Sequence, residues 1–267
     1  MNLSRDRLAW CSDPHLDHAR PDVRDQFVED LNESSAGGLI ITGDIAEADS
    51  LHRHVNRLHR DFDGPIWFVL GNHDFYKDSV ASVRSEVTRW VRHLRGVDYL
   101  TDSAAVPLAD GVYLVGEDGW GDATCGDFDA SPVRLQDFVW IRDFSRKPPD
   151  MWRETMDRLG RQSATRLRPK LDAIPAEAKE IIVATHVPPF RESCWYEGQT
   201  TDDDWAPFFV CGHVGEALRS FAGRRPATTI TVLCGHTHHG GVAQIANNLT
   251  VHTASADYGR PTFRPVP

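Results

Sequence analysis

The sequence predicts an α/β fold in which a parallel or mixed β-sheet is covered by helices on its outside. Two observations predict this fold: short apolar runs alternate with longer amphipathic stretches, and three strand–loop–helix units follow one another in the first third of the chain. The 267 residues, of which 40% are hydrophobic, suffice for a substantial core. We therefore expect one domain over residues 1–267.

The three units are recognised by the contrast between their apolar runs and the periodic stretches that follow. Each run is short, almost wholly apolar and bounded by polar residues, which is typical of a buried strand. The predicted strands are 8–11, 38–41 and 66–70. Each following stretch has apolar residues at helical spacing, as Val23, Phe27 and Leu31 illustrate. The predicted helices are 21–33, 48–60 and 79–94.

The second half of the chain contains further strands and two long irregular segments. Its predicted strands are 111–115, 181–184 and 229–234, followed by a hairpin of 242–246 and 249–253. Its predicted helices are 151–171 and 214–221. The irregular segments 116–150 and 188–207 are rich in aromatic residues and are expected to be lid-like or binding loops. Their Trp and Tyr residues could either pin the loops to the core or form a wall of a substrate pocket.

Charge and composition limit the partners of the protein. A net charge of −10 disfavours an extended nucleic acid, which is usually bound by a basic face, but does not disfavour a small phosphorylated molecule. No apolar run approaches the roughly 20 residues of a membrane span, and the polar residues 1–7 lead into a run too short for a signal peptide. The five scattered cysteines fit a reducing cytoplasm, with Cys11 and Cys234 as small buried hydrophobic residues.

Polar motifs follow directly after the predicted strands. They are Asp13-Pro-His15, Gly43-Asp44, Gly71-Asn72-His73-Asp74, Thr185-His186 and Gly235-His236-Thr237-His238. Ligands of α/β sheets bind at the carboxyl ends of strands, so the five loops should meet in one crevice. Asp, His and Asn side chains together suit divalent metals such as Zn, Mn and Fe. Two ions about 3.5–4 Å apart need a bridging carboxylate and several terminal ligands, and these motifs supply enough of both.

The five motifs in this order resemble those of the calcineurin-like metallophosphoesterase superfamily, and the resemblance extends over most of the chain. It implies two facing mixed β-sheets flanked by helices, a four-layer αββα sandwich. It also implies that one metal is bound by Asp13, His15 and His238 and the other by Asn72, His186 and His236. Asp44 would bridge the two ions. Mn, Fe and Zn all tolerate such ligands, and Mn is favoured.

The resemblance also assigns the catalytic side chains. His73 lies where the family has a histidine that touches the substrate and assists the leaving group. Asp74 is placed to hold that imidazole in position. A hydroxide bridging the two metals would attack the phosphorus in line, while a protonated His73 donates to the departing oxygen.

The expected reaction is hydrolysis of a small phosphomonoester or phosphodiester. The segment His186-Val-Pro-Pro189 is similar to one in some cyclic-nucleotide phosphodiesterases of the superfamily. Two alternatives are a metal-dependent nuclease, for which no basic track is present, and a non-catalytic metal-binding scaffold, although every ligand position is intact. A protein Ser/Thr phosphatase is disfavoured because no arginine follows Gly43-Asp44 closely. The sequence specifies no oligomeric state.

Overall fold

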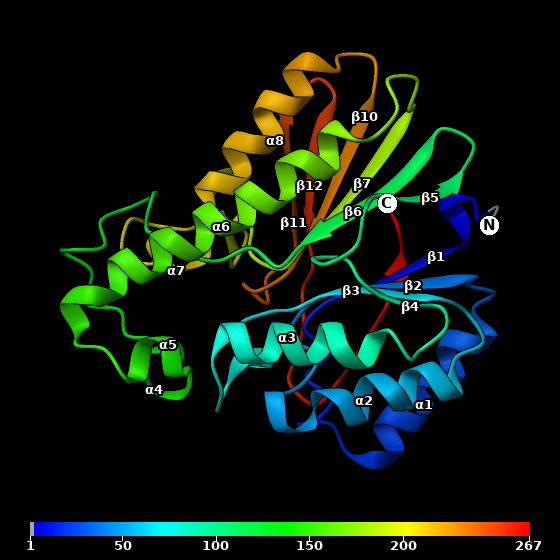
Figure 1. Ribbon diagram of the computed structural model, residues 1–267, viewed down its shortest axis with the longest axis horizontal. Coiled ribbons are helices and arrows are strands. Elements are labelled where there is room, and N and C mark those ends of the chain that lie inside the picture. The colour runs from blue at the N-terminus through cyan, green and yellow to red at the C-terminus, as the bar shows by residue number, and fades with distance from the viewer. Residues whose placement is uncertain (1–2) are drawn as a thin grey trace.

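The computed structural model describes residues 3–267; Met1 and Asn2, which begin the polar N-terminal segment, lie outside the described residues. Two large β-sheets face each other, and helices cover the outer face of each (Figure 1). This arrangement confirms the four-layer αββα sandwich. Within residues 3–267, no helix is long and apolar enough to cross a membrane.

The first sheet is built from the three strand–loop–helix units and two short edge strands. Its strands are β1 (Leu8–Cys11), β2 (Gly38–Thr42), β3 (Ile66–Val69), β4 (Val97–Tyr99) and β13 (Arg264–Pro265). The order is β13-β1-β2-β3-β4, with β1 to β4 parallel and β13 antiparallel to β1. The helices on its outer face are α1 (Pro21–Glu33), α2 (Ala48–Asp61) and α3 (Val80–Val91).

The second sheet has six strands. They are β5 (Val106–Ala109), β6 (Val112–Glu117), β7 (Glu180–Thr185), β10 (Thr229–Cys234), β11 (Gly241–Ala246) and β12 (Leu249–Thr253). The order is β11-β12-β10-β7-β6-β5, in which the four central strands are parallel and both edge strands are antiparallel. The helices on its outer face are α6 (Trp152–Asp172) and α8 (Gly212–Arg224).

Successive side chains of each strand point to opposite faces of its sheet, and in the central strands the side chains on both faces are apolar. In β2, Leu39 and Ile41 pack toward the helices of the first sheet, whereas Ile40 points into the space between the sheets. The layer between the sheets includes Trp10, Ile40, Trp67, Leu114, Ile182 and Leu233. The interior therefore consists of three apolar layers, which fixes the two sheets face to face.

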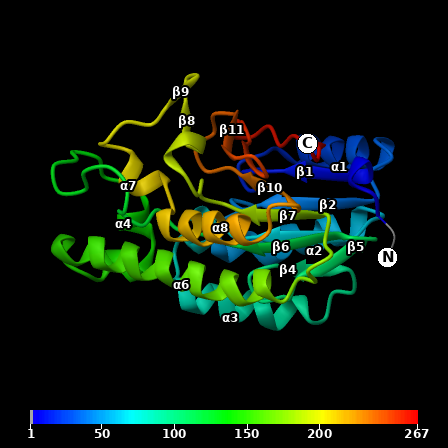
Figure 2. The ribbon, with the colours of Figure 1, turned by 90° about the horizontal axis from the view of Figure 1, so that it is seen from above.

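The two irregular segments lie at the carboxyl ends of the central strands (left in Figure 1, and from above in Figure 2). Their short elements are α4 (Asp137–Trp140), α5 (Arg142–Ser145), β8 (Trp195–Tyr196), β9 (Gln199–Thr200) and α7 (Ala206–Phe209). The aromatic residues of these segments differ in burial: Trp120 is buried and stacks with Phe144, with the ring centroids 5.8 Å apart, whereas Tyr196 and Trp205 are exposed. The first segment is thus pinned to the core, and the second keeps aromatic side chains at the surface.

Asp118, directly after β6, connects the first sheet to the second. Its buried carboxylate accepts hydrogen bonds from the Leu70 amide (2.8 Å), Arg84 Nε (2.8 Å), the Tyr99 hydroxyl (2.6 Å) and the Thr101 hydroxyl (2.7 Å). These donors lie after β3, in α3, in β4 and just after β4. One carboxylate therefore satisfies four donors from the neighbouring sheet and its covering helix.

We expect Asp118→Ala to lower the free energy of unfolding by roughly 3–5 kcal/mol, because it leaves Arg84 and the other donors without their buried acceptor. Urea denaturation followed by circular dichroism measures the change. Asp110→Ala is the matched control, since the Asp110 side chain is 97% exposed and its ion pair with Lys179 contributes little. Equal stability of the two variants would contradict the role given to Asp118.

Candidate metal centre

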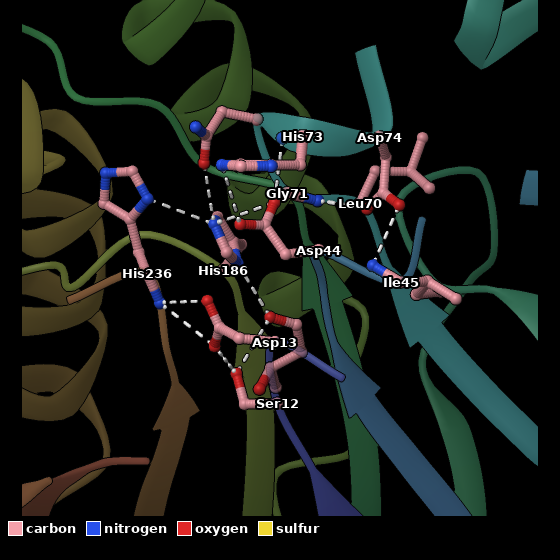
Figure 3. A network of polar contacts seen from close by, with 12 residues as sticks. Ser12, Asp13, Asp44, Ile45, Leu70, Gly71, His73, Asp74, His186 and His236 are labelled. Carbon is pink, nitrogen blue, oxygen red and sulfur yellow. Dashed lines mark hydrogen bonds and ion pairs between the residues drawn. The ribbon is translucent and has the colours of Figure 1, made fainter. Parts of the chain in front are cut away.

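The five motif loops meet at the carboxyl ends of strands from both sheets. Asp13 and His15 follow β1, Asp44 follows β2 and Asn72 follows β3, while His186 follows β7 and His236 and His238 follow β10. Figure 3 shows Asp13, Asp44, His186 and His236 directed toward one another. The structure thus brings together all seven side chains that the sequence indicated as metal ligands.

One group of donor atoms comprises those of Asp13, His15, Asp44 and His238, all within 4.8 Å of one another. His15 Nε2 lies 3.1 Å from His238 Nε2 and 3.8 Å from Asp44 Oδ2. His238 Nε2 lies 3.5 Å from Asp13 Oδ1. Two atoms that each bind one ion at about 2.1 Å are about 3.0–3.4 Å apart. The separation of 3.1 Å lies in this range, and those of 3.5 Å and 3.8 Å exceed it by a few tenths of an ångström.

A second group surrounds His186. Its Nε2 atom lies 3.1 Å from Asn72 Oδ1, 3.1 Å from His236 Nδ1 and 3.5 Å from Asp44 Oδ1. Asp44 therefore presents Oδ1 to this group and Oδ2 to the group that contains His15. A carboxylate placed between two sets of donors has the geometry of a bridging ligand.

Hydrogen bonds from outside the two groups orient several of these side chains. His186 Nδ1 donates to the Thr42 carbonyl at 2.8 Å, and His236 Nε2 donates to the Phe208 carbonyl at 3.2 Å. A carbonyl only accepts, so each ring keeps a lone pair on the nitrogen that faces the centre. The Asn72 amide donates to Asp137 Oδ1 at 2.9 Å, which turns its own oxygen toward His186.

Of the two buried carboxylates at the centre, Asp44 has too few cationic partners of its own. Burial, and next the Asp13 carboxylate, raises the pKa of Asp44 well above its usual range. Burial also acts against ionisation of Asp13, but contacts with His238 and the nearby His186 hold the pKa of Asp13 below its usual range. Divalent cations would supply the missing positive charge at this place.

The backbone at the centre is strained. Nine non-glycine residues of the described chain have positive φ, and five of these carry motif side chains. The five are Asp13, His15, Asp44, His236 and His238. Such conformations cost on the order of 1–3 kcal/mol each and concentrate at functional sites. Close packing adds to the constraint, because a Cβ at Gly71 would lie 2.2 Å from Asp44 Oδ1 and 2.6 Å from His186 Cε1.

His73 lies at the rim of the centre and borders an open pocket of about 310 Å³. Its side chain is 18% exposed, whereas that of Asp44 is 2% exposed. Burial, and next the neighbouring His186, lowers the pKa of His73 to about 4, so the ring is neutral near pH 7. The Tyr258 hydroxyl lies 3.3 Å from His73 Nε2, and the Tyr258 ring stacks on His15 with the centroids 4.2 Å apart.

The Asp74 carboxylate binds backbone amides and not the His73 ring, which corrects the expectation that Asp74 holds this imidazole in position. Its carboxylate accepts from the backbone amides of Ile45 (2.9 Å), Ala46 (3.0 Å) and Gly71 (2.8 Å). The short 3₁₀ turn over His73–Phe75 directs Asp74 inward, so it is fully buried and holds the Asp44 loop against the Gly71 loop. Asp74 is thus a positioning residue for the backbone.

Asp137 and Tyr258 are site residues that the sequence did not indicate. Asp137 belongs to α4 and accepts hydrogen bonds from Asn72 and from the Tyr76 hydroxyl at 2.8 Å. Tyr258 follows the last strand of the second sheet. Neither residue lies in a motif or next to one, so only the tertiary structure reveals them.

We expect Asp137→Ala to weaken metal binding at the Asn72 group by about 10–100-fold, because the Asn72 amide loses the acceptor that orients it. Isothermal titration calorimetry with Mn²⁺ resolves the weaker site. Asp143→Ala is the control. Asp143 lies in the neighbouring α5, and its carboxylate accepts a hydrogen bond from the Val80 amide and contacts none of the proposed ligands. If Asp137→Ala bound Mn²⁺ at the weaker site as tightly as the unsubstituted protein does, Asp137 would not orient Asn72 for metal binding.

Comparison with known proteins provides independent evidence. The family model for calcineurin-like phosphoesterases matches residues 6–240. The structure of a phosphopantetheinyl hydrolase from Mycobacterium tuberculosis is similar with a TM-score of 0.68 and 16% identity, over 95% of this chain and 90% of that chain. A dimetal phosphatase from Danio rerio is similar with a TM-score of 0.57 and 14% identity, over 93% of this chain and 87% of that chain. Both likenesses concern the fold. A search of curated protein sequences finds no significant match.

Proposed function

Since the chain belongs to the calcineurin-like phosphoesterase family, we propose that it hydrolyses a small phosphoester with two divalent metal ions as cofactors. The observation that carries this proposal is the position of Asp44, whose two carboxylate oxygens face two separate groups of donor atoms. The Danio rerio protein, whose fold is similar, is a dimetal phosphatase, which agrees with a centre of this kind.

The proposed ligands follow from the two groups. Asp13, His15 and His238 would bind one ion, Asn72, His186 and His236 the other, and Asp44 both. The donor set of imidazole nitrogens, carboxylates and one amide oxygen fits Mn, Fe or Zn, and we favour Mn. The oriented ring nitrogens and the Asp44 carboxylate, which lacks a balancing cation, support occupation by cations.

When bound, the two ions would acidify a water molecule to supply a bridging hydroxide as the nucleophile and would offset the charge of the phosphate oxygens. The protein groups at the rim act on the substrate itself. His73 borders the open pocket, so its imidazole can reach a phosphoester placed over the ligands. The anionic ester favours the protonated ring, from which a proton passes to the departing oxygen. The Tyr258 hydroxyl lies 3.3 Å from His73 Nε2 and can orient the ring.

A substrate panel tests the proposal. The protein is loaded in turn with Mn²⁺, Fe²⁺ and Zn²⁺, its metal content is measured, and monoesters, cyclic nucleotides and nucleotide diphosphates are assayed with each metal. We expect turnover of at least one small phosphoester, abolished by a chelator and restored by added metal. Plasmid and single-stranded DNA in the same panel test the nuclease alternative. A fully loaded protein that turns over no phosphoester would contradict the proposal.

A further inference from the structure

A mostly apolar recess of about 500 Å³ lies beside the metal centre and is not used by the chemistry described so far. Its walls come mainly from residues 194–205, which include the β8–β9 hairpin, and from Phe209 and Thr237. Phe209 and Thr237 also line the pocket over the proposed ligands, so the two hollows adjoin. Its volume is in the range of small-molecule sites, about 300–1,000 Å³.

Two rows of rings lead from the proposed ligands toward the recess. In the first row, Phe209 packs on His236 with the centroids 4.4 Å apart, and Trp205 meets Phe209 edge-on at 5.7 Å. In the second row, Tyr196 meets His239 edge-on with the ring centroids 4.7 Å apart, and His239 directly follows His238 in the chain. The walls of the recess therefore pack against His236, a proposed metal ligand, and against His239, which follows the proposed ligand His238 in the chain.

The inner wall is held by close contact with the second sheet. The indole of Trp195 packs against β11 at Gly241, where a Cβ would lie 2.4 Å from its ring atoms. Because Gly241 has no side chain, the Trp195 ring can lie directly against β11. This contact holds the β8–β9 hairpin against the second sheet. The tryptophan wall is thus part of the folded structure and need not be assembled around a ligand.

The charges of the recess restrict its occupant. Its only charged side chains are the carboxylates of Glu197 and Asp202, and within residues 3–267 no Lys or Arg lines it. A second phosphate or a carboxylate would face these acidic groups without a cation to pair with. A flat, uncharged ring can instead pack against Tyr196 and Trp205, which are 59% and 47% exposed and so are free to contact it.

We propose that this recess binds an uncharged aromatic ring carried by the alcohol part of the phosphoester. The inference rests on the proposed function, because the metal centre would hold the phosphate while the ring lies between Tyr196 and Trp205. The preferred substrates are then phosphoesters of ring-bearing alcohols, and simple alkyl esters are poor substrates.

Two phosphonates test the inference without the complication of turnover. Calorimetry on the Mn²⁺-loaded protein compares n-propylphosphonate with 3-phenylpropylphosphonate, which carry the same acidic group and differ by one ring. We expect the ring to tighten binding about tenfold. Trp205→Ala and Tyr196→Ala should each reduce this ratio to about twofold or less. Trp140→Ala is the matched control, since Trp140 is 48% exposed in α4 and lines neither hollow, and it should keep the full ratio.

The outcomes separate the two proposals. Binding of both phosphonates with equal affinity overturns the aromatic recess and leaves the metal centre intact. Absence of binding of either phosphonate to the loaded protein overturns the proposed function, and the recess inference that rests on it. A ring preference that persists in both Trp205→Ala and Tyr196→Ala, with native circular dichroism spectra, places the ring elsewhere and also overturns the inference.

Discussion

Asp44→Ala is expected to abolish turnover and to empty both metal positions together. Asp44 presents one oxygen to the His186 group at 3.5 Å and the other to the His15 group at 3.8 Å, so its removal takes a ligand from each. Losing the two ions removes several kcal/mol of transition-state stabilisation. At 1.36 kcal/mol for each tenfold change, turnover should fall by roughly 10³-fold or more. Metal analysis after dialysis and a phosphate-release assay measure the two effects.

Asp49→Ala is the control for this variant. Asp49 lies five residues further along the chain in α2, and its carboxylate is 62% exposed and pairs with Lys77 on the surface. We expect it to keep both metals and full activity. If Asp44→Ala retained full occupancy at either position, its assignment as the bridging ligand would be wrong.

His73→Ala is expected to reduce turnover by about 10²–10⁴-fold while both metals stay bound, because it removes the proposed proton donor of the leaving group and no proposed ligand. The side chain lies at the rim, with Nε2 4.0 Å from Asp44 Oδ2, and borders the open pocket. Initial rates and metal content measured on the same sample separate the two functions.

A substrate with a good leaving group sharpens the test of His73. An ester of p-nitrophenol needs less protonation of its departing oxygen than an alkyl ester, so His73→Ala should slow the alkyl ester more strongly. His52→Ala is the control, since His52 is exposed on α2 and packs against Trp90. Loss of metal from His73→Ala would show that the residue is a ligand and has been misassigned.

Much of the fold could be predicted because the central strands are continuous apolar runs between periodic helices. The helix expected over 21–33 is α1, with the same bounds, and the strand at 229–234 is β10. The edge strands β4, β5 and β13 were not predicted. They have two to four residues each and include Asp98, Pro107 and Arg264, so no apolar run marks them. Pairing with a longer neighbour stabilises these strands.

The convergence of the motifs could also be predicted, because parallel strands place the loops that follow them at one edge. The expected partner of His73 was wrong for a local reason. Asp74 is its neighbour in the chain, but the 3₁₀ turn sends the two side chains in different directions. Asp137 is 65 residues from Asn72, and Tyr258 is 185 residues from His73. Unlike the motif residues, neither Asp137 nor Tyr258 directly follows a predicted strand, so nothing in the sequence pattern places them at the centre.

The division of the proposed ligands between the two sheets has a consequence for biosynthesis. The first sheet supplies Asp13, His15, Asp44 and Asn72, whereas His186, His236 and His238 come from the second and are translated more than 100 residues later. A nascent chain that has completed only β1 to β4 therefore lacks part of each proposed ligand group. If the ions bind as proposed, their tight uptake would become possible only once both halves have docked, and metal binding would then report that folding is complete.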